Sequence, residues 1–445
     1  MKRRHFLGLM GAGGLGMLPF AEAWADGLPS SLLGANPLWI PTNPPRNTVP
    51  TNIGARGRVV VVGGGMAGAT VAKYLRLWGG VDLQVTLVER EASYVSNIMS
   101  NLVLNKVIDM NSLSFNWNRL VASYGVRLVR GEVVGIDSVG KQVMLAGGTR
   151  LPYDRLVIAP GIEFETVPGL ETEAARALVP HAWKAGVQTT ALRDRILAMP
   201  AGGVFVMSIP KAPYRCPPGP YERACVVADY LKRTKPGSKV IVLDENAGII
   251  AEKESFSFAF NVTHAGVIDY RPATAVLSVD AARGRIYTSN GTVDGNVLNV
   301  IPNQRAGAVL AGTGLLNVGN RWAGVDVLSY ESTAIPGVHI LGDSAATTQP
   351  KAGHIANQEA KVCADAIVRA FLGMPPDPAP VTNSACYSPI TASTASWLTA
   401  VYNYDPASRT MKLVANMPAE ARQATSENMA QMRQWFSNLM TDSFA

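Results

Sequence analysis

Four cysteines carry the most reactive side chains of this 445-residue sequence, namely Cys216, Cys225, Cys363 and Cys386. No two of them are spaced as C-x-x-C and no C-x-x-C-H occurs, so we expect no zinc ribbon, no other metal site and no c-type haem on this chain. Cys225 and Cys363 fall within predicted helices among apolar neighbours, which favours inert buried thiols. Cys216 and Cys386 lie in Pro- or Ser-flanked segments that we expect to be irregular. A structural disulfide, two free thiols and a redox-active pair all agree with their spacing.

The segment around Cys216 stands where a nucleotide-binding loop would be expected. Residues 203–208 and 239–243 are predicted strands and residues 222–232 a predicted helix, which together form a βαβ unit. The connection Pro210–Pro220 contains five prolines, each of which lacks a backbone N–H. Because such a loop is a poor cradle for a pyrophosphate, we predict that NAD(P)H does not bind there.

Two charged residues flank Cys216. Arg215 precedes it and would attract an anion and lower the pKa of a nearby thiol, although a solvated surface charge explains it equally well. Glu222 lies at the start of the predicted helix, where the helix dipole alone favours a carboxylate. The sequence alone does not decide between a functional and a purely structural interpretation of Arg215 and Glu222.

A glycine motif near the start of the chain predicts a dinucleotide site. Residues 58–62 form an apolar run typical of a buried parallel strand, a helix is predicted over 69–77, and a second strand over 84–88 ends at Glu89. The glycines between the first strand and the helix follow G-x-G-x-x-G, at Gly63, Gly65 and Gly68. In this pattern the glycines allow a tight turn and close approach of a pyrophosphate to the helix N-terminus, and the acid binds a ribose.

Two later segments favour FAD over NAD as the cofactor. One predicted strand closes on Gly161, and another ends at Gly342 and Asp343. This pair resembles flavoproteins with two dinucleotide domains, in which the Asp binds FAD; a simple turn residue is the alternative for Asp343. Lys351 stands just before a predicted helix over 355–371, whose N-terminus would point at the flavin and stabilise negative charge there.

These elements predict an α/β fold with two Rossmann-like dinucleotide-binding domains, one FAD-binding and discontinuous, the other degenerate. A C-terminal interface segment follows them. The expected ranges are 56–175 and 290–375 for the FAD-binding domain, 176–289 for the degenerate NAD-like domain and 376–445 for the C-terminal domain. A helix is predicted over 419–440, with one apolar face made of Met429, Met432, Phe436 and Met440. Core or interface packing is the preferred interpretation of that face, and a membrane- or quinone-facing helix is the alternative.

The first 25 residues read as a leader rather than as part of the fold. Arg3 and Arg4 precede an apolar stretch over residues 6–20, and Ala23-Trp24-Ala25 supplies small residues for cleavage. This pattern predicts a twin-arginine signal over 1–25, or else an ordinary secretory leader, and therefore a periplasmic protein. Residues 26–55 are expected to form an irregular linker or arm.

Composition argues against two classes of partner. The net charge is +7, and without the predicted leader it is +5 with no Lys/Arg run, which does not favour nucleic acid. No other apolar run reaches 18 residues, so no transmembrane segment is expected in the mature chain.

Several longer segments carry a more specific resemblance to a known family. They are residues 62–70, 180–186, 215–224, 301–307 and 384–388, together with Trp435-Phe436. The sequence resembles the flavoprotein subunit of flavocytochrome c sulfide dehydrogenase over essentially its whole mature length. The proline-flanked Cys216 followed by Tyr-Glu-Arg is the most specific of these segments, because the FAD motifs are shared with a much wider superfamily.

The resemblance implies a chemistry for these residues. Cys216 and Cys386 would form a redox-active disulfide facing the flavin, with Cys386 the better candidate for contact with it, and Glu222 would handle protons. Some family members attach FAD covalently through a cysteine at the position of Asn97, so we predict that FAD is bound non-covalently here. The substrate would be sulfide, and the partner a c-type cytochrome subunit that receives the electrons. A sulfide:quinone oxidoreductase and a non-enzymatic flavoprotein with a structural disulfide are the alternatives.

Overall fold

An eight-stranded sheet organises the first part of the chain. The computed structural model describes residues 49–51, 53–417 and 419–445, so the predicted leader and most of the predicted arm lie outside the described residues. The sheet has the order β22-β19-β20-β21-β9-β1-β2-β5. Its parallel strands are β1 (Gly57–Val62), β2 (Leu83–Glu89), β5 (Arg127–Arg130), β9 (Arg155–Ile158) and β21 (Val338–Ile340). Their order is that of a Rossmann-like sheet, as the glycine motif predicts.

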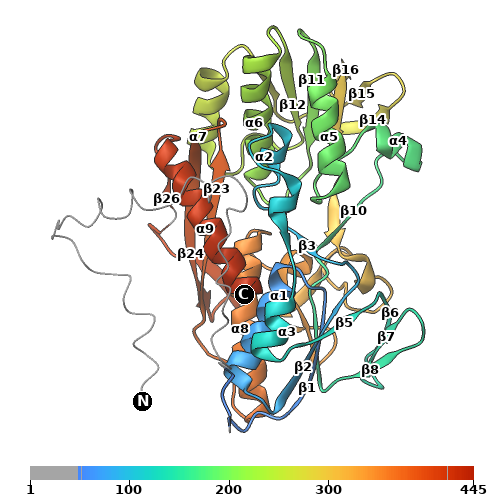
Figure 1. Cartoon of the computed structure of the whole chain (residues 1–445), viewed down its shortest axis with the longest axis vertical. Helices are drawn as coiled ribbons and strands as arrows, with labels where there is room; N and C mark the ends of the chain where they lie inside the picture. Colours follow the sequence, from blue (N-terminus) through green and yellow to red (C-terminus); the bar gives the residue numbers. More distant parts are fainter. Residues whose placement is uncertain (1–48, 52, 418) are drawn as a thin grey trace, which may run out of the picture. The chain divides into compact units, whose positions relative to one another are not determined.

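Each face of this sheet is covered by a different layer. On one side α1 (Met66–Gly79) packs against α8 (Gly353–Phe371), α3 (Asn118–Tyr124) and α9 (Ser426–Phe444) (Figure 1). On the other side an antiparallel sheet contributes Val143 and Leu145 to the core beneath β1 and β9. Its strands are β6 (Val133–Asp137), β7 (Gln142–Leu145) and β8 (Arg150–Pro152). The strands β19 (Ala323–Asp326), β20 (Glu331–Ser332) and β22 (Ala345–Ala346) extend the eight-stranded sheet beyond β21.

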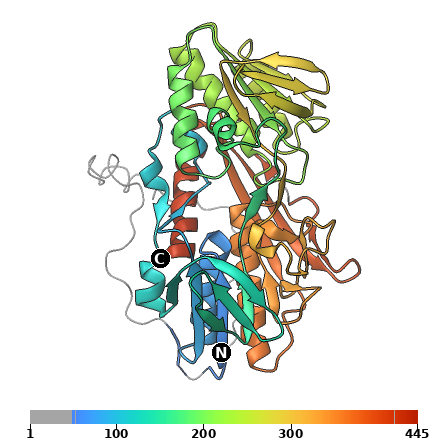
Figure 2. The same cartoon turned by 90° about the vertical axis from the view of Figure 1, so that its right-hand side faces the viewer.

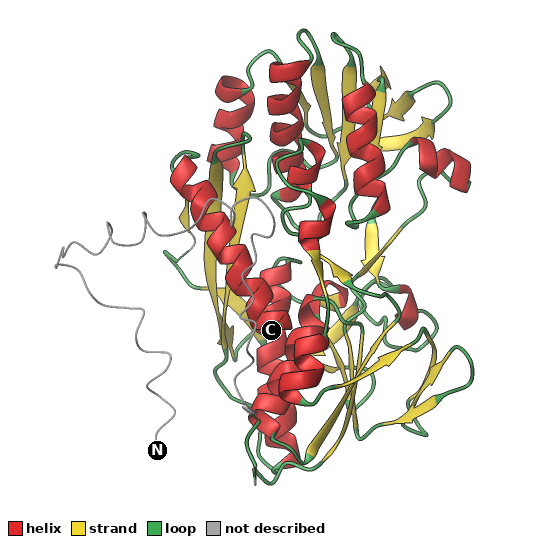
Figure 3. Cartoon of the chain, viewed as in Figure 1, coloured by secondary structure: helices red, strands yellow, loops and turns green. Residues whose placement is uncertain are grey.

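The second sheet is parallel and confirms a second Rossmann-like unit. Its order is β13-β12-β11-β17, with bounds β11 (Val204–Ile209), β12 (Lys239–Asp244), β13 (Ile268–Arg271) and β17 (Val297–Val300). The helices beside it are α5 (Val187–Ala198), α6 (Gly219–Thr234) and α7 (Lys253–Phe258), which a π-helical turn over Ala259–Thr263 continues (Figure 3). Because β17 pairs with β11, this sheet extends past residue 289, where the predicted range of the domain ends.

An antiparallel sheet lies against the second unit and completes its core (Figure 2). Its strands are β14 (Val276–Asp280), β15 (Arg285–Thr288) and β16 (Gly291–Asp294). The remaining short elements are β3 (Tyr94–Val95), α2 (Asn101–Leu104), η3 (Met110–Leu113), β4 (Ser114–Phe115), β10 (Ile162–Phe164), α4 (Glu173–Leu178), β18 (Gln304–Ala306), η5 (Ala308–Leu310) and η6 (Gly342–Ser344).

The C-terminal part combines a third sheet with α9. The strands are β23 (Val381–Pro389), β24 (Ala395–Asp405), β25 (Thr410–Leu413) and β26 (Ala419–Glu420). The helix predicted from residue 419 begins only at Ser426, because Thr425 caps it by accepting from the amide of Asn428 while residues 419–420 pair with β24. All four apolar side chains of the predicted face are buried, namely Met429, Met432, Phe436 and Met440. Among the described residues, no helix combines the length and apolarity needed to span a bilayer.

Candidate functional site

The glycine motif forms a loop in which Gly63 and Gly68 leave no room for a side chain. Gly63 has φ +94°, and a Cβ there would lie 2.5 Å from the carbonyl oxygen of Ala159. A Cβ at Gly68 would overlap the carbonyl oxygen of Gly63, so the helix can approach the strand only with glycine at this position. Helix α1 begins at Met66 without a side-chain cap, which leaves its first N–H groups available to a phosphate.

Glu89 connects the end of β2 to this loop. Its Oε2 accepts from the amide of Gly64 at 2.7 Å, and its Oε1 accepts from the amide of Glu91 at 2.8 Å. These bonds fix the carboxylate beside the glycine turn, and each oxygen retains a lone pair for a ribose hydroxyl. The predicted strand, glycine turn, helix and acid are therefore assembled as the sequence indicates.

Asp343 supplies the observation that best fits a bound cofactor. Its Oδ1 is buried and has no hydrogen-bond partner, and its Oδ2 lies 3.9 Å from Nη1 of Arg215. Burial raises the pKa of Asp343, whereas Arg215 and Lys351 lower it. A buried carboxylate oxygen without a partner is costly unless a ligand donates to it. The ribityl hydroxyls expected of FAD match this requirement, because a hydroxyl can donate to a carboxylate oxygen.

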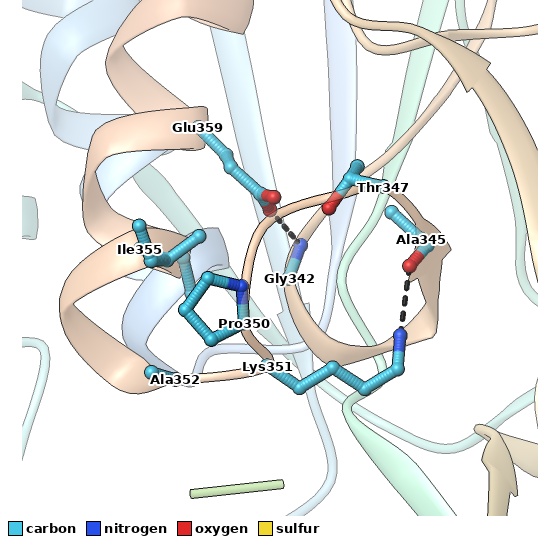
Figure 4. A pocket seen from close by; sticks show the side chains of 9 residues that line it. Gly342, Ala345, Thr347, Pro350, Lys351, Ala352, Ile355 and Glu359 are labelled. Carbon is cyan, nitrogen blue, oxygen red and sulfur yellow. Dashed lines mark hydrogen bonds between the residues drawn. The ribbon is translucent and has the colours of Figure 1, made fainter. Parts of the chain in front are cut away.

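A small pocket is lined by residues between Gly342 and Glu359, the segment that includes Asp343 and the start of α8 (Figure 4). Glu359 is buried, and its Oε2 accepts from the amide of Gly342 at 2.8 Å. Lys351 donates to the carbonyl of Ala345 at 2.8 Å and lies 3.8 Å from the centre of the Trp322 ring. Burial lowers the pKa of Lys351 to about 8 and raises that of Glu359 to about 8.

Cys216 lies at the junction between the two Rossmann-like units. Its amide donates to the carbonyl of Lys351 at 2.7 Å, and its carbonyl accepts from the amide of Gly219 at 2.9 Å. Its φ of +59° is uncommon for a residue with a side chain. Gly219 must be glycine, because a Cβ there would lie 2.8 Å from Sγ of Cys216 and 2.9 Å from the Trp183 ring.

Cys386 approaches the same region from the C-terminal sheet. It lies in β23, a regular strand rather than the irregular segment we expected. The preceding residue, Ala385, donates its amide to Nδ1 of His354 in the first turn of α8 at 2.9 Å. Lys351 and His354 flank the start of α8, so both cysteines are anchored beside that helix N-terminus. Both are free cysteines in the structure, as are Cys225 and Cys363, which are buried as predicted.

The charges of the two cysteines and Glu222 act on one another. Burial raises the pKa of Cys216 well above its usual value, and the charges of Cys386 and Glu222 raise it further. The pKa of Cys386 is raised to about 12, mainly by burial and to a smaller extent by the charges of Glu252 and Glu222. Glu222 is 7% exposed, and its Oε1 accepts from Nδ2 of Asn101 at 3.0 Å. Burial raises its pKa to about 8, which keeps a proton on this carboxyl near neutral pH.

Arg215 is not the solvated surface charge that the sequence left open. Its side chain is only 12% exposed, donates to the carbonyl of Trp183 and faces Asp343. The charge of Arg215 acts on the nearby thiol in the expected direction. Arg215 does lower the pKa of Cys216, but desolvation outweighs it.

The acid at the end of β12 in the second unit already has hydrogen-bond partners within the protein. Asp244 ends β12, where a nucleotide-binding domain would place its ribose-binding acid. It accepts from the hydroxyls of Tyr221 at 2.9 Å and Tyr270 at 2.7 Å, and from Nδ2 of Asn246 at 2.8 Å. These contacts support the prediction of a degenerate site, which stays a prediction.

Several residues that shape the site were not predicted. Asn101 orients Glu222 and accepts from Nε of the buried Arg223, whose Nη2 donates to the carbonyl of Ala182. Asn97, at the position of the family's covalent cysteine, accepts from the amide of Ala185 at 2.8 Å. The part of the chain that the structure describes contains no group of three His, Cys, Asp or Glu residues arranged for a metal ion.

Comparisons with known proteins agree with this geometry. Residues 189–302 match the family "Sulfide dehydrogenase [flavocytochrome c] flavoprotein chain, central", and residues 378–444 match "Flavocytochrome c sulphide dehydrogenase, flavin-binding". Residues 57–196 match "Pyridine nucleotide-disulphide oxidoreductase".

Curated relatives match only part of the chain. The probable ferredoxin reductase CtmF of Castellaniella defragrans is 38% identical over 109 residues, which are 24% of this chain and 27% of that protein. The type II NADH:quinone oxidoreductase NdhA of Mycobacterium tuberculosis is 27% identical over 136 residues, 28% of each chain. This chain thus spans about a quarter of the length of these relatives.

Solved structures match over most of the chain and show the fold. The sulfide:quinone oxidoreductase of Aquifex aeolicus has a TM-score of 0.69 at 18% identity, covering 86% of this chain and 90% of that one. A NAD-dependent persulfide reductase from A. fulgidus has a TM-score of 0.58 at 16% identity, covering 87% and 77%. Two family models specific to these proteins match the segments that contain Cys216 and Cys386, and a third matches the first Rossmann-like unit. The chain therefore belongs to the flavoprotein chains of flavocytochrome c sulfide dehydrogenase, within the pyridine nucleotide-disulphide oxidoreductases.

Proposed function

We propose that this protein is an exported, FAD-dependent sulfide dehydrogenase that oxidises hydrosulfide through a disulfide between Cys216 and Cys386. The observation that carries the proposal is the anchoring of both cysteines at the start of α8. Cys216 is held by the carbonyl of Lys351, and the strand that bears Cys386 is held by His354. A reactive sulfur pair beside the predicted flavin site is what such an enzyme requires.

The residues that would hold FAD belong to both halves of the first sheet. The glycine turn at Gly63, Gly65 and Gly68 would receive the pyrophosphate, and Glu89 would bind the ribose. Asp343 would bind the FAD groups beyond the pyrophosphate. The approach to this cofactor site would be lined by Gly161, Gly342 and Lys351. Bound FAD supplies a two-electron acceptor that can release its electrons singly. We propose that it is bound non-covalently, because Asn97 offers no thiol.

The disulfide would react first with the substrate. Hydrosulfide attacks one sulfur of the pair, so the Cys216–Cys386 bond breaks and a bond to the substrate sulfur forms. We assign the persulfide to Cys216 and the departing thiolate to Cys386, the residue proposed to contact the flavin. The outer sulfur of the persulfide would then leave as zero-valent sulfur, or as polysulfide when a second hydrosulfide attacks it, and Cys216 would return to a thiolate. The two thiolates would form the disulfide again, and bound FAD would be the acceptor of their two electrons.

Charged groups around the pair suit an anionic substrate. Arg215 is the cation whose charge acts directly on Cys216, and it would attract hydrosulfide and stabilise the transient thiolate. Glu222, which holds a proton near neutral pH, would donate it to the departing thiolate and take it back when the disulfide forms again.

The electron acceptor and the location complete the proposal. We propose a c-type cytochrome subunit as the partner, which the family name supports, and export to the periplasm by the twin-arginine signal predicted over residues 1–25. The structural likeness to a sulfide:quinone oxidoreductase reflects the shared fold, so a quinone is the acceptor to test against the cytochrome.

An anaerobic sulfide titration of the FAD-loaded protein tests this function. We expect sulfide to bleach the flavin absorbance, and added cytochrome c, but not a soluble quinone analogue, to restore it quickly. Absence of bleaching would overturn the enzymatic proposal and leave a flavoprotein with a structural cysteine pair. Faster recovery with the quinone would replace the proposed acceptor.

A further inference from the structure

The backbone of Arg215 and Cys216 is held by residues outside the proline-rich loop. The amide of Arg215 donates to Oε1 of Gln304 at 2.8 Å, and the amide of Cys216 donates to the carbonyl of Lys351 at 2.7 Å. The carbonyl of Arg215 accepts from Nε1 of Trp183 at 3.2 Å. Three separate segments of the chain therefore bind the same two residues.

These two residues include the strained position of the loop. Cys216 has φ +59°, in the left-handed region that residues with a side chain rarely adopt. A residue in such a conformation persists only where the surrounding contacts determine it. The hydrogen bonds to Arg215 and Cys216 are contacts of this kind, so we expect the place of the sulfur to depend on them.

Gln304 is a fixed point in the first of these contacts. It is fully buried in β18, where it stands opposite Phe164 of β10. Its own carbonyl accepts from Nε of Arg321 at 2.5 Å. The orientation of its side-chain amide is settled, because the backbone N–H of Arg215 can donate only to the oxygen of that amide.

The nitrogen of the same side chain indicates what Gln304 is for. Nε2 of Gln304 is buried and has no hydrogen-bond partner among the described residues. A buried donor without a partner costs stability, which offsets part of the gain from the oxygen. The balance points to a role in positioning the loop rather than in stabilising the fold.

Trp183 is the second fixed point. Its indole N–H donates to the carbonyl of Arg215, and its own carbonyl accepts from the guanidinium of the same residue. The ring is buried, and Cζ of the buried Arg223 lies 4.7 Å from its centre. Arg223 also donates to the carbonyls of His181 and Ala182, so the segment that carries Trp183 is itself held in place.

We propose that Gln304 and Trp183 are positioning residues, which hold the sulfur of Cys216 where it can bond to that of Cys386. The proposal rests on the proposed function and deepens it. Two thiols that are already held in place form a disulfide more readily than two mobile thiols, because less freedom is lost when the bond forms. Removal of either contact should therefore weaken the disulfide.

Redox titration of the FAD-loaded protein in anaerobic glutathione buffers measures this effect. As the Cys216–Cys386 bond forms, the two thiols give two electrons and two protons to glutathione disulfide, which becomes two glutathione thiols. In Gln304→Met, a side chain of similar length without the oxygen, the equilibrium constant for disulfide formation should fall about three- to tenfold, as for the loss of one hydrogen bond. Trp183→Phe, which keeps a ring but lacks the N–H, should show a fall of the same size.

Two further variants make the titration specific. Gln304→Glu keeps an acceptor oxygen for the amide of Arg215, so its equilibrium constant should stay close to that of the wild-type protein. Asn296→Leu is the matched control. Oδ1 of Asn296 also accepts from a backbone amide, that of Val204 at 2.8 Å, but at the end of β11 remote from the proline-rich loop. Its constant should equal that of wild type.

Alkylation of the reduced protein provides a measurement that needs no disulfide. Cys216 should react about three- to tenfold faster in Gln304→Met and in Trp183→Phe than in wild type, because the loss of a hydrogen bond raises the population of the released loop. Cys386 lies in β23, which these variants do not alter, and should react at its wild-type rate.

The outcomes separate this proposal from the proposed function. Wild-type constants and wild-type alkylation of Cys216 in Gln304→Met and Trp183→Phe would overturn the positioning role. Equal losses in Gln304→Met and Gln304→Glu would also overturn it, because the acceptor oxygen would then be irrelevant. A wild-type protein that forms no Cys216–Cys386 disulfide in any buffer would refute the proposed function, whereas the alkylation rates would still decide whether Cys216 is held.

Discussion

The amide nitrogen of Cys216 lies 2.7 Å from the carbonyl oxygen of Lys351 and donates a hydrogen bond to it. This bond joins the proline-rich loop of the second Rossmann-like unit to the segment that leads into α8 of the first. This backbone contact between the two units therefore helps to fix the position of the sulfur relative to the predicted flavin site. Changes that displace the loop should affect the chemistry without removing any reactive group.

Gly219→Ala is the sharpest way to displace this sulfur. The new Cβ would lie 2.8 Å from Sγ of Cys216 and 2.9 Å from the Trp183 ring, and overpacking of this kind costs about 1–3 kcal/mol. We expect the rate of flavin bleaching by sulfide, measured by stopped-flow, to fall roughly tenfold to hundredfold with FAD still bound. Gly248→Ala is the control, because a Cβ there meets no atom within 4 Å. Equal rates in both variants would show that the sulfur position is not critical.

Glu222→Gln should change stability in a pH-dependent way. Burial raises the pKa of Glu222 from 4.5 to about 8 on folding, so between these values the folded protein binds more protons than the unfolded chain. The contribution of this group to stability is therefore lost as pH rises through that window. At pH 8 the melting temperature of the variant should be at least about 2–4 °C higher than that of wild type. At pH 4.5 the two melting temperatures should agree.

Thermal melts at the two pH values, recorded on the FAD-loaded protein, provide the measurement. Glu173→Gln, an exposed first-turn glutamate of α4, serves as the control and should show no such gain. A Glu222→Gln variant whose melting temperature differs from wild type equally at both pH values would argue against a buried, protonated carboxyl.

The flavin should leave the protein on denaturation. Asn97 stands where some family members have the covalent cysteine, and its side chain is already used by the amide of Ala185. We expect acid precipitation to release all flavin into the supernatant as FAD, measured by its absorbance. Flavin that sediments with the protein would require a covalent bond to another residue.

Local sequence was sufficient to predict the first Rossmann-like unit. The run of valines in β1, the glycine turn and Glu89 are consecutive features, and each has one physical interpretation that the fold satisfies. The second unit was recognised for the same reason, although β17 could not be assigned to it. A short apolar strand does not show which sheet it joins until its pairing with β11 is known.

The C-terminal part was harder to predict, because polar residues interrupt the alternation of apolar and polar side chains that indicates a strand. Thr382, Ser384 and Ser388 are buried in β23, so the strand that bears Cys386 lacks the usual apolar alternation. The roles of Asn101 and Gln304 were missed for another reason. Their significance lies in contacts with Glu222 and Arg215, which are more than eighty residues away in the sequence.

The most direct test of the account is to map the cysteine linkage by mass spectrometry of the oxidised FAD-loaded protein, digested without reduction, before and after anaerobic sulfide. We predict one cross-linked peptide pair that contains Cys216 and Cys386, and its disappearance, with both residues open to alkylation or carrying extra sulfur, once sulfide is added. Separate peptides with free thiols before sulfide, or a cross-link that sulfide leaves intact, would contradict it.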